Sequence, residues 1–341
     1  MTSATDSSTG EGTPRSVCAI VIAYRAGVDL IRCLDSICAQ SRACDIVVVN
    51  NDPSDNSLDA AKVKFPTALF CQPEHNLGYA GGANLGASRS RAEILVFMNP
   101  DVRLSPGCIG ALADNLNPEV GVAGPVMEIG KTGGREYGST LNRLGMPFGL
   151  AAPQRKPLYV SGAVLATPRR VFERIGGFDE RYFMFMEDAE YCWRVLLTGL
   201  DVVCVETAEA WHAGGAVAAG GYPMEGRPYA TSELRLTHRE RNTLAMFMVC
   251  APWTWLPIIV PALLARTLGL ALATLVLGHG RTALRLLQGI AWNIADLSTT
   301  LQRRRVLPRS RWGASTAHHR MTHRPVLMLA LLRHWPPQII D

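Results

Sequence analysis

The chain has 341 residues, which is enough for one large domain with an appendage or for two domains. Apolar residues make up 48% of it and charged residues 18%, and so low a charged fraction indicates more apolar surface than a freely soluble enzyme has. The nine cysteines include no C-x-x-C pair. This pattern argues against a disulfide framework or a zinc site and favours reduced, buried thiols in a cytosolic compartment.

Short apolar runs alternate with helical patterns over the first third of the chain. Residues 1–16 are rich in Ser, Thr and Gly without an apolar core, so we expect a disordered N-terminus and no signal peptide. Runs at 17–24, 45–50, 68–71 and 93–98 predict strands, and residues 28–40 and 80–89 predict helices. This series predicts an α/β fold with a mostly parallel sheet flanked by helices, which binds ligands beyond the carboxyl ends of its strands.

The pattern weakens after residue 120. Residues 121–157 are rich in Gly and Pro, and we expect hairpins and a mobile loop there. Residues 158–166 and 201–205 predict further strands, 168–175 a short helix, and 187–199 a longer helix with an acidic first turn. We expect residues 17–241 to form one catalytic domain.

Four acidic or basic side chains in this domain have the chemistry of a metal-assisted site. Asp101 follows a buried strand through Asn99-Pro100, Glu187 and Asp188 are adjacent, and His212 follows Trp211. An acid and a histidine can hold a divalent cation against a diphosphate, and a free carboxylate can remove a proton. Taken singly, these residues are equally compatible with a turn, first-turn helix acids and a core histidine.

Two further segments could contact a nucleotide. Residues 47–57 end a strand in Asn, Asp and Ser, which can bind a nucleobase or form a plain Asx turn. Residues 75–86 contain four glycines, which allow close approach of a ligand, and the following helix would offer N–H groups to phosphate. The second segment has neither the G-x-G-x-x-G pattern nor a P-loop, which argues against a dinucleotide oxidoreductase and an ATPase.

The C-terminal third is more apolar. Residues 244–265 and 267–278 contain no charged residue, but three prolines argue against one straight spanning helix. Trp253 and Trp255 suit a membrane interface, and arginines lie on both sides. We therefore expect residues 242–300 to form an apolar helical segment that associates with a membrane as a re-entrant or interfacial element; a spanning helix, a core helix and an oligomer contact remain alternatives.

Residues 301–341 form an arginine-rich segment, which we expect to be a basic tail. It could meet an anionic membrane or nucleic acid, or it could simply be solvated. Because aromatic residues are not interleaved with its arginines, no nucleic-acid partner is expected.

Five stretches in chain order resemble the catalytic domain of glycosyltransferase family 2, which has the GT-A fold. They are IVIAYRAGVDLIRCLDSI, VVVNNDPSD, HNLGYAGGANLGA, ILVFMNPDVRL and IGGFDERYFMFMEDAEYCWRVLLTGLDVVCVETAEAWHAGG. The resemblance covers about 200 residues, from 17 to 215. Within the family the chain looks most like the rhamnosyltransferases and galactofuranosyltransferases that act on cell-envelope polysaccharides.

The resemblance implies roles for individual residues. Asp101 matches the metal-binding acid of the D-x-D-type motif, Asn99 replaces the first acid of that motif, and His212 matches a second metal ligand. Asp188 matches the general base, and Glu187 is expected to orient the acceptor or the base. The residues expected to bind the nucleotide-sugar donor are Tyr24, Asn50, Asp55, Asn76, Gly81, Asn84 and Asn99.

The expected function is an inverting glycosyl transfer that depends on Mg²⁺ or Mn²⁺. A sugar, with rhamnose as one candidate, would pass from a nucleotide diphosphate to a hydroxyl of a lipid-linked cell-envelope glycan. The enzyme would work at the cytoplasmic face of the cell membrane, bound peripherally or by a re-entrant segment. Two alternatives remain open: transfer of a sugar to a polyprenyl phosphate, and a non-catalytic scaffold that binds glycans.

Overall fold

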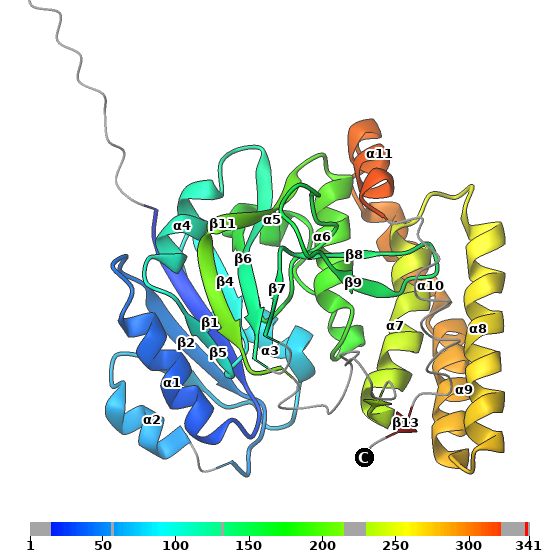
Figure 1. Cartoon of the computed structure of the whole chain (residues 1–341), viewed down its shortest axis with the longest axis horizontal. Coiled ribbons are helices and arrows are strands. Elements are labelled where there is room, and N and C mark those ends of the chain that lie inside the picture. Colours follow the sequence, from blue (N-terminus) through cyan, green and yellow to red (C-terminus); the bar gives the residue numbers. More distant parts are fainter. Residues whose placement is uncertain (1–14, 56–57, 131–132, 215–229, 322–337, 340–341) are drawn as a thin grey trace, which may run out of the picture.

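A large sheet covered by helices on both faces is joined to a group of C-terminal helices that lie along one side of it (Figure 1). The computed structural model describes residues 15–55, 58–130, 133–214, 230–321 and 338–339. Disorder was predicted for residues 1–16, of which 1–14 lie outside the described residues, as does most of the segment after residue 321. Arg15 and Ser16 are described, and the prediction is wrong for them: Arg15 donates to the carbonyl of Leu116, and the N–H of Ser16 donates to Glu93.

The elements have the following bounds. The strands are β1 Val17–Ala23, β2 Asp45–Asn50, β3 Leu69–Cys71, β4 Ile94–Met98, β5 Val102–Leu104, β6 Val120–Ile129, β7 Gly134–Glu136, β8 Ser139–Leu141, β9 Pro147–Gly149, β10 Val164–Pro168, β11 Asp201–His212, β12 Ala230–Thr231 and β13 Gln338–Ile339. The helices are α1 Gly27–Cys38, α2 Leu58–Lys64, α3 Gly78–Ser88, α4 Cys108–Asn115, α5 Arg169–Arg174, the 3₁₀ turn η1 Glu180–Tyr182, α6 Glu187–Leu197, α7 Glu233–Cys250, α8 Leu256–Val276, α9 Gly280–Ala295, α10 Leu297–Val306 and α11 Arg311–Arg320.

The main sheet runs in the order β3-β2-β1-β4-β10-β6-β11-β5, with β7 added beside β6. Strands β1 to β4 pair in parallel, and so do β6 and β11, whereas β10 and β5 are antiparallel to their neighbours. Strand β1 is buried along its whole length, and successive residues alternate between two hydrophobic clusters, one on each face. Burial on both faces explains the unbroken apolar run, and the prediction of a mostly parallel α/β sheet is confirmed.

Strand β6 is the main difference from the sequence-based expectation. It occupies ten residues where hairpins and a mobile loop were expected, and it pairs with β10, β11 and β7. Gly121 and Gly124 favoured the prediction of a loop. In the structure, an added Cβ at Gly121 would lie 2.4 Å from Val195, and one at Gly124 would lie 2.6 Å from Val160. These glycines therefore serve close packing, and the packing outweighs their low strand propensity.

Other differences are smaller. Strand β10 begins at Val164, several residues later than predicted, and β11 continues to His212, well past the predicted end at residue 205. A register shift between Val205 and Glu209 interrupts the pairing of β11 with β6, and the polar residues around it hid the second half of the strand. Helices α2 and α4 were not predicted.

The apolar C-terminal stretch is divided between two helices. The last turns of α7 belong to the core around the sheet, where the ring of Phe247 meets that of Trp193 on α6 edge to face at 5.2 Å. The chain then turns at Pro252, and α8 begins at Leu256 with Pro257 in its first turn, where a missing N–H costs little. Residues 244–250 are thus a core helix, one of the alternatives considered, and α8 carries most of the remaining apolar residues.

Arginines expected in a basic tail are instead packed against the domain. Arg304 lies 4.0 Å from the ring centre of Trp253 and donates to the carbonyl of Met248 at 2.8 Å. Arg309 donates to the carbonyls of Val249 and Cys250. These are the last carbonyls of α7, which have no partner within the helix and lie at the negative end of its dipole. The two arginines therefore cap a core helix, and Arg304 is buried in doing so, whereas Arg309 stays exposed.

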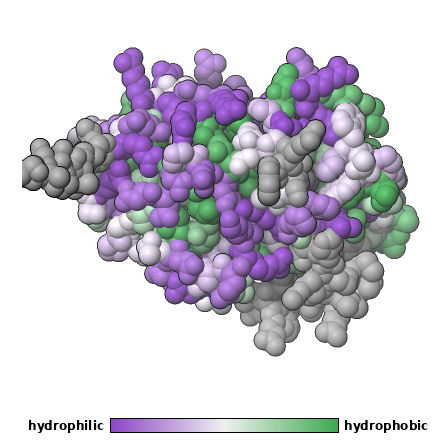
Figure 2. Space-filling view, turned by 90° about the horizontal axis from the view of Figure 1, so that it is seen from above, coloured by the Kyte–Doolittle hydropathy of each residue, from purple (hydrophilic) through white to green (hydrophobic). Residues whose placement is uncertain are grey.

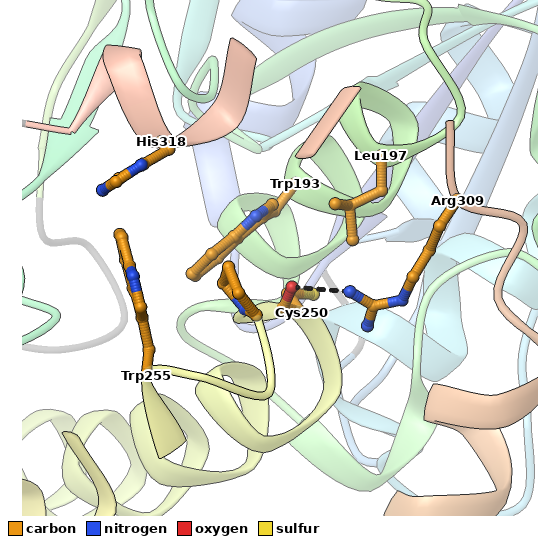
Figure 3. Close-up of a pocket in the computed structure, with 7 residues that line it drawn as sticks. Trp193, Leu197, Cys250, Trp255, Arg309 and His318 are labelled. Atoms are coloured by element: carbon orange, nitrogen blue, oxygen red, sulfur yellow. Dashed lines mark hydrogen bonds between the residues drawn. The ribbon is translucent and has the colours of Figure 1, made fainter. Parts of the chain in front are cut away.

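A small cavity of about 40 Å³ lies where α6, the α7–α8 turn and α11 meet (Figure 3). Its lining is mainly aromatic and apolar, from Trp193, Leu197, Cys250, Pro252, Trp255, Arg309 and His318. Trp193 and Leu197 come from the C-terminal half of α6, away from the acid pair at its first turn. The cavity is therefore a packing defect of the helical region, too small for a nucleotide sugar.

Helix α6 contains a fully buried ion pair between Glu190 and Arg194, with N and O atoms 2.7 Å apart. The guanidinium also donates to the carbonyls of Ile175 and Gly177, both at 2.6 Å. Removing one member of a buried pair leaves an uncompensated charge.

We expect Glu190→Gln to lower the free energy of unfolding by about 3 to 5 kcal/mol, because Arg194 loses its counter-charge. Urea denaturation followed by circular dichroism measures this. The matched control is Glu173→Gln, which breaks a pair with Arg169 at an acid that is 63% exposed. That change should cost less than about 1 kcal/mol. Equal losses in the two variants would contradict the assignment.

Candidate active site

Asp101 and His212 meet at the edge of the sheet where β4 ends and β11 ends. Antiparallel pairing sets His212 opposite Val102, the residue after Asp101, and the N–H of Ala213 donates to the carbonyl of Asp101 at 3.2 Å. As a result, Nε2 of His212 lies 3.3 Å from Oδ1 of Asp101. The side chain of Asp101 is 5% exposed and that of His212 is 11% exposed. The structure thus brings together two residues that are 111 positions apart in the sequence.

These two side chains could bind a divalent cation and leave its other coordination positions to further ligands. A carboxylate oxygen suits Mg²⁺ and Mn²⁺, and an imidazole nitrogen favours Mn²⁺. Over the described ranges, no group of three or more His, Cys, Asp or Glu residues could hold a metal by itself. Any cation held by Asp101 and His212 would therefore take its other ligands from water and from a phosphate-bearing substrate.

The acid pair Glu187 and Asp188 opens α6. Oδ2 of Asp188 accepts from the N–H of Gly162 at 2.9 Å, and Oδ1 accepts from the N–H of Ala189 at 2.7 Å. Desolvation by burial raises the pKa of Asp188 above its usual range, although these N–H groups act in the opposite direction. Burial, followed by the neighbouring charge of Asp188, raises the pKa of Glu187 well above its usual range.

Oε2 of Glu187 is a buried carboxyl oxygen without a hydrogen-bond partner. A buried carboxyl with a raised pKa and a neighbouring acid favours its neutral form, so the pair carries one negative charge more readily than two. Of the two acids, Asp188 has the hydrogen bonds that favour a carboxylate and is the better candidate for a base.

The residues just before β10 connect the acid pair Glu187–Asp188 to the pair Asp101–His212. Gly162, which donates to Asp188, precedes Ala163, whose carbonyl accepts from the N–H of Asn99 at 3.1 Å. Asn99 is two residues before Asp101. The acids of α6 and the pair Asp101–His212 therefore border the same edge of the sheet, beyond the carboxyl ends of β1 and β4, where ligands of such sheets bind.

Tyr79 was not predicted for this site. Its hydroxyl donates to the carbonyl of Gly162 at 2.5 Å, and an added Cβ at Gly162 would lie 3.3 Å from that hydroxyl and 3.4 Å from Cβ of Asp188. Burial, with the charges of Glu187 and Asp188 as smaller contributions, raises the pKa of Tyr79 well above its usual range, so it stays a neutral donor. The only sequence signal was its place in the glycine-rich stretch.

The backbone before the acid pair is strained. Phe183, Phe185 and Met186 have φ values of 62°, 66° and 71°, in a region that residues with a side chain rarely adopt. Such conformations cost roughly 1 to 3 kcal/mol each and persist only where the surroundings hold them. Nothing in the amino-acid pattern of residues 183–186 indicated this strain.

The residues predicted to contact the base are engaged within their own loop. Nδ2 of Asn50 donates to the carbonyl of Asp52 at 2.8 Å, and its Oδ1 accepts from the N–H of Asp52. This is the Asx turn considered as the alternative. The N–H of Asp55 donates to the same carbonyl at 3.1 Å. Tyr24 follows β1 and lies under the guanidinium of Arg25, 5.2 Å from its ring centre. Base contacts by Tyr24, Asn50 and Asp55 stay predictions.

The glycine-rich stretch packs differently from its prediction. The N–H of Gly78, the first of α3, donates to Oδ1 of Asn76, and that of Ala80 donates to the carbonyl of Phe183. These two N–H groups are therefore engaged within the protein, and phosphate binding at this helix start stays a prediction. Oδ1 and Nδ2 of Asn84 bond to the backbone of Phe178 at 3.0 Å.

The glycines of α3 lie against protein and not toward an open site. An added Cβ at Gly81 would lie 2.9 Å from that of Leu77, and one at Gly86 would lie 2.3 Å from Cγ2 of Ile20. The helix thus needs glycine to approach the sheet closely. Contacts of Asn76, Gly81 and Asn84 with a donor stay predictions, and the structure gives all three a packing role.

Comparisons with known proteins identify the family. Residues 18–176 match the sequence model of Glycosyl transferase family 2. The chain is 31% identical over 230 residues to an N-acetylglucosaminyl-diphospho-decaprenol L-rhamnosyltransferase of Mycobacterium tuberculosis, a match that covers 57% of this chain and 74% of that protein.

Two solved structures share the fold. GalNAc-T7 with UDP, GalNAc and Mn²⁺ superposes with a TM-score of 0.57 at 12% identity, over 70% of this chain and 48% of that one, so the match spans about half of that longer chain. The mannosyltransferase PcManGT of Pyrobaculum calidifontis, with GDP-Man and Mn²⁺, gives a TM-score of 0.51 at 17% identity over 86% of each chain. The fold is thus the GT-A arrangement that the sequence resemblance implied, and the chain is a glycosyltransferase that belongs to family 2.

Proposed function

We propose that this glycosyltransferase moves a sugar from a nucleotide diphosphate to a hydroxyl of a lipid-linked cell-envelope glycan, with inversion at the anomeric carbon. Rhamnose is the first candidate sugar, because the relative that is 31% identical is named as a rhamnosyltransferase acting on N-acetylglucosaminyl-diphospho-decaprenol. The observation that carries the proposal is the meeting of Asp101 and His212 at 3.3 Å, at the sheet edge that Asp188 also borders.

The leaving group needs charge compensation during the transfer. Asp101 and His212 would hold a Mn²⁺ or Mg²⁺ ion, which, when bound, offsets the negative charge that develops on the departing diphosphate. Both neighbours of the fold, GalNAc-T7 and PcManGT, were solved with Mn²⁺ and a nucleotide or nucleotide sugar. This agrees with a donor set of one carboxylate and one imidazole.

Asp188 would act on the acceptor. An acceptor hydroxyl is a poor nucleophile until its proton is removed. As its oxygen forms a bond to the anomeric carbon, the bond from that carbon to the diphosphate breaks, the proton passes to Asp188, and the nucleotide diphosphate leaves. The N–H groups of Gly162 and Ala189 fix both oxygens of this carboxylate, so its orientation is set before the acceptor arrives.

The test is transfer of rhamnose from dTDP-rhamnose to N-acetylglucosaminyl-diphospho-polyprenol in the presence of Mn²⁺, with other sugar nucleotides as competitors. We expect Asp188→Asn to lower kcat by at least about 100-fold and to leave the KM of the donor within about threefold, because the base acts on the acceptor. Asp114→Asn, at an acid that is 72% exposed and paired with Arg42, is the control with unchanged kcat.

Two results would argue against this assignment. Retention of full turnover by Asp188→Asn would remove Asp188 as the base. Transfer by the wild-type enzyme to a polyprenyl phosphate, and not to the hydroxyl acceptor, would favour the alternative acceptor, which needs no strong base. No transfer from any sugar nucleotide by the wild-type enzyme would reject the donor class.

The pH dependence of kcat/KM should report the free Asp188, since this profile reflects groups of the free enzyme. Burial raises the pKa of Asp188 above its ordinary value of 3.8, so protonation inactivates the base at a higher pH than it would an exposed aspartate. We therefore expect the acid limb of the profile to fall above pH 3.8 and to be absent from the residual activity of Asp188→Asn. An identical limb in that variant would assign it to another group.

The exposed face of the C-terminal helices supports attachment to a membrane. Among the described helices, α8 is long and apolar enough to cross a bilayer. One third of its most apolar stretch of 18 residues is buried in the protein. Large apolar side chains project from α8 and α9 into solvent; we call this set the apolar face, and it consists of Ile258, Leu268, Leu272, Leu275, Val276, Leu284, Leu287 and Ile294. Figure 2 shows hydrophobic atoms along the end of the molecule where these helices lie.

An interfacial position suits this face better than a span. The other side of α8 packs along α7 and α9, and α9 carries Arg281 and Arg285, so the three helices could not cross a bilayer without burying charge. Arg281, with its side chain 76% exposed, lies beside the apolar face near anionic headgroups in this arrangement. We therefore place the enzyme on the cytoplasmic membrane surface, next to a lipid-linked acceptor.

We expect the double variant Leu272→Glu and Leu275→Glu to reduce co-sedimentation with phosphatidylglycerol vesicles by at least about tenfold, because each leucine contributes about 1.5 to 3 kcal/mol of apolar burial. The two side chains are 64% and 58% exposed, so folding should be unaffected. The control is Val63→Glu on α2, at a side chain that is 85% exposed and outside the apolar face. If the double variant binds vesicles as the wild type does, and the wild type is a dimer where the variant is a monomer, the apolar face is instead a contact between two copies of the chain.

A further inference from the structure

We propose that Asn242, a buried amide on α7, is a positioning residue for the reaction: it holds residues 182–186 in the strained conformation that presents Glu187 and Asp188. The inference rests on the proposed role of Asp188 as the base. It assigns to the C-terminal helices a part in catalysis, beyond attachment to a membrane.

The amide nitrogen of Asn242 lies within hydrogen-bond distance of three carbonyls of the strained loop. Its Nδ2 is 2.9, 3.0 and 2.7 Å from the carbonyl oxygens of Tyr182, Met184 and Phe185, and its two N–H groups are shared among these three acceptors. The side chain has no exposed surface. One amide group thus gathers three carbonyls from four consecutive residues, which the chain could not bring together in an ordinary extended or helical conformation.

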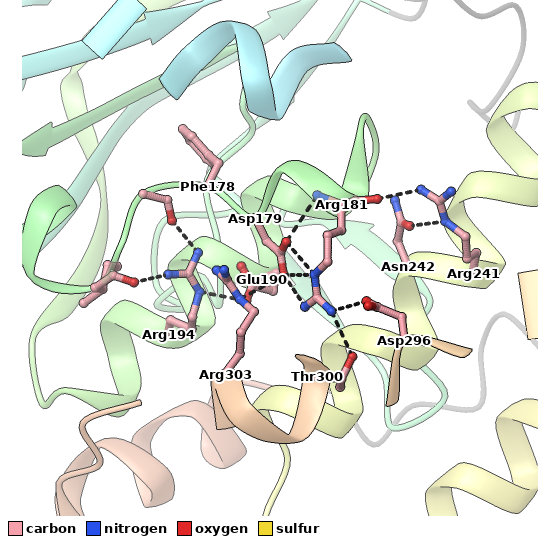
Figure 4. A network of polar contacts seen from close by, with 12 residues as sticks. Phe178, Asp179, Arg181, Glu190, Arg194, Arg241, Asn242, Asp296, Thr300 and Arg303 are labelled. Atoms are coloured by element: carbon pink, nitrogen blue, oxygen red, sulfur yellow. Dashed lines mark hydrogen bonds and ion pairs between the residues drawn. The ribbon is translucent and has the colours of Figure 1, made fainter. Parts of the chain in front are cut away.

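The orientation of the amide is fixed by its neighbour on α7. Oδ1 of Asn242 accepts from Nε of Arg241 at 2.9 Å, so Nδ2 must face the loop (Figure 4). The same guanidinium donates through Nη2 to the carbonyls of Arg181 and Tyr182, at 3.1 and 2.9 Å. Since arginine can only donate, the assignment of the two ends of the amide follows from chemistry.

The donors around the loop account for its carbonyls one by one. The carbonyls of Arg181 and Tyr182 accept from Arg241, and that of Phe183 accepts from the N–H of Ala80 on α3. The carbonyls of Met184 and Phe185, and again that of Tyr182, accept from Asn242. Phe183 and Phe185 have positive φ values and cannot continue a regular helix or sheet, so donors from α3 and α7 bond to their carbonyls instead. Asn242 supplies more of them than any other residue in the described part of the chain.

Side chains of α7 also contact the rings of the loop. His238 stacks on Phe183 with ring centres 5.7 Å apart, and Arg235 lies 5.0 Å from the ring centre of Phe185. Helix α7 is in turn held by α9, where the ring of Trp292 lies 4.6 Å from the guanidinium of Arg241. The acid pair is thus supported by a helix that lies outside the region matched by the family model, residues 18–176.

The loop is anchored at its other end by a separate network. Arg181 bonds to Asp179 at 2.6 Å and also pairs with Asp296, between α9 and α10, and Arg303 pairs with Asp179 at 3.0 Å (Figure 4). With this end fixed independently, loss of the Asn242 amide should release residues 182–186 without detaching the whole segment.

The test is Asn242→Asp in the full-length enzyme, assayed for sugar transfer as above. The carboxylate has the same shape, but it turns three attractive contacts with carbonyl oxygens into repulsive ones. We expect kcat to fall at least tenfold while the KM of the nucleotide sugar and its Mn²⁺-dependent thermal stabilisation change less than about threefold, because Asp101 and His212 lie on other elements.

The matched control is Asn293→Asp on α9. Asn293 is 3% exposed and donates to the helix carbonyls of Arg241 and Gly289, with no contact to residues 182–186. It should lower the melting temperature as Asn242→Asp does and leave kcat within about twofold. If Asn242→Asp is too unstable to purify, Asn242→Ser, which keeps one donor, should lose less activity than Asn242→Ala at similar stability.

Two outcomes would overturn the proposal. One is wild-type kcat in folded Asn242→Asp. The other is a loss of kcat in Asn293→Asp equal to that in Asn242→Asp, which would mean that loss of stability alone explains both. Failure of the proposed function is distinguishable from either, since in that case the wild-type enzyme itself would transfer no sugar.

Discussion

The burial of α6 is the constraint on which the site depends. All its residues are buried except Asp188, which is half-buried, and the helix lies between the sheet on one side and α7 and α11 on the other. Its first turn carries two acids. Burying a carboxylate is costly unless hydrogen bonds compensate it. The N–H groups of Gly162 and Ala189 do so for Asp188, and the fixed position of α6 in the core allows them to reach it.

A helix that starts in the core must be reached by a chain that is itself partly buried: Tyr182 and Met186 are buried, and residues 183–185 between them are half-buried. Residues 182–186 enter α6 without room for an ordinary turn, and the positive φ values of Phe183, Phe185 and Met186 result. The stability that the packed helix contributes is partly offset by this strain. The donors of α7 and α3 stabilise the arrangement, and α7 continues from Glu233 to Cys250, across the domain boundary that the sequence predicts at residue 241.

The predicted elements were those in which one short segment carries its own signal. Strands β1, β2 and β4 are continuous apolar runs because both faces of the sheet are covered, and the acidic start of α6 was visible at Glu187. Strand β6 was missed because its glycines, Gly121 and Gly124, are required by side chains of Val195 and Val160 from distant segments. No local pattern contains that information.

The same distinction explains the candidate site. Asp101 and His212 were recognised as metal-binding types through a family resemblance, and the pairing of β5 with β11 brings them together. Asn50, by contrast, bonds to Asp52 two residues away, an outcome that composition alone allowed but did not select. Asn242 could not be found at all, because its partners are backbone carbonyls, which every residue has.

The C-terminal helices serve two environments at once. The outer sides of α8 and α9 expose leucine and isoleucine, while α7 turns Asn242 and Arg241 toward the loop before the acid pair. Helices α7, α8 and α9 pack against one another, and the ring of Trp292 on α9 contacts the guanidinium of Arg241 on α7. The surface proposed to rest on the membrane and the amide proposed to hold the loop before the base therefore belong to one packed group of helices.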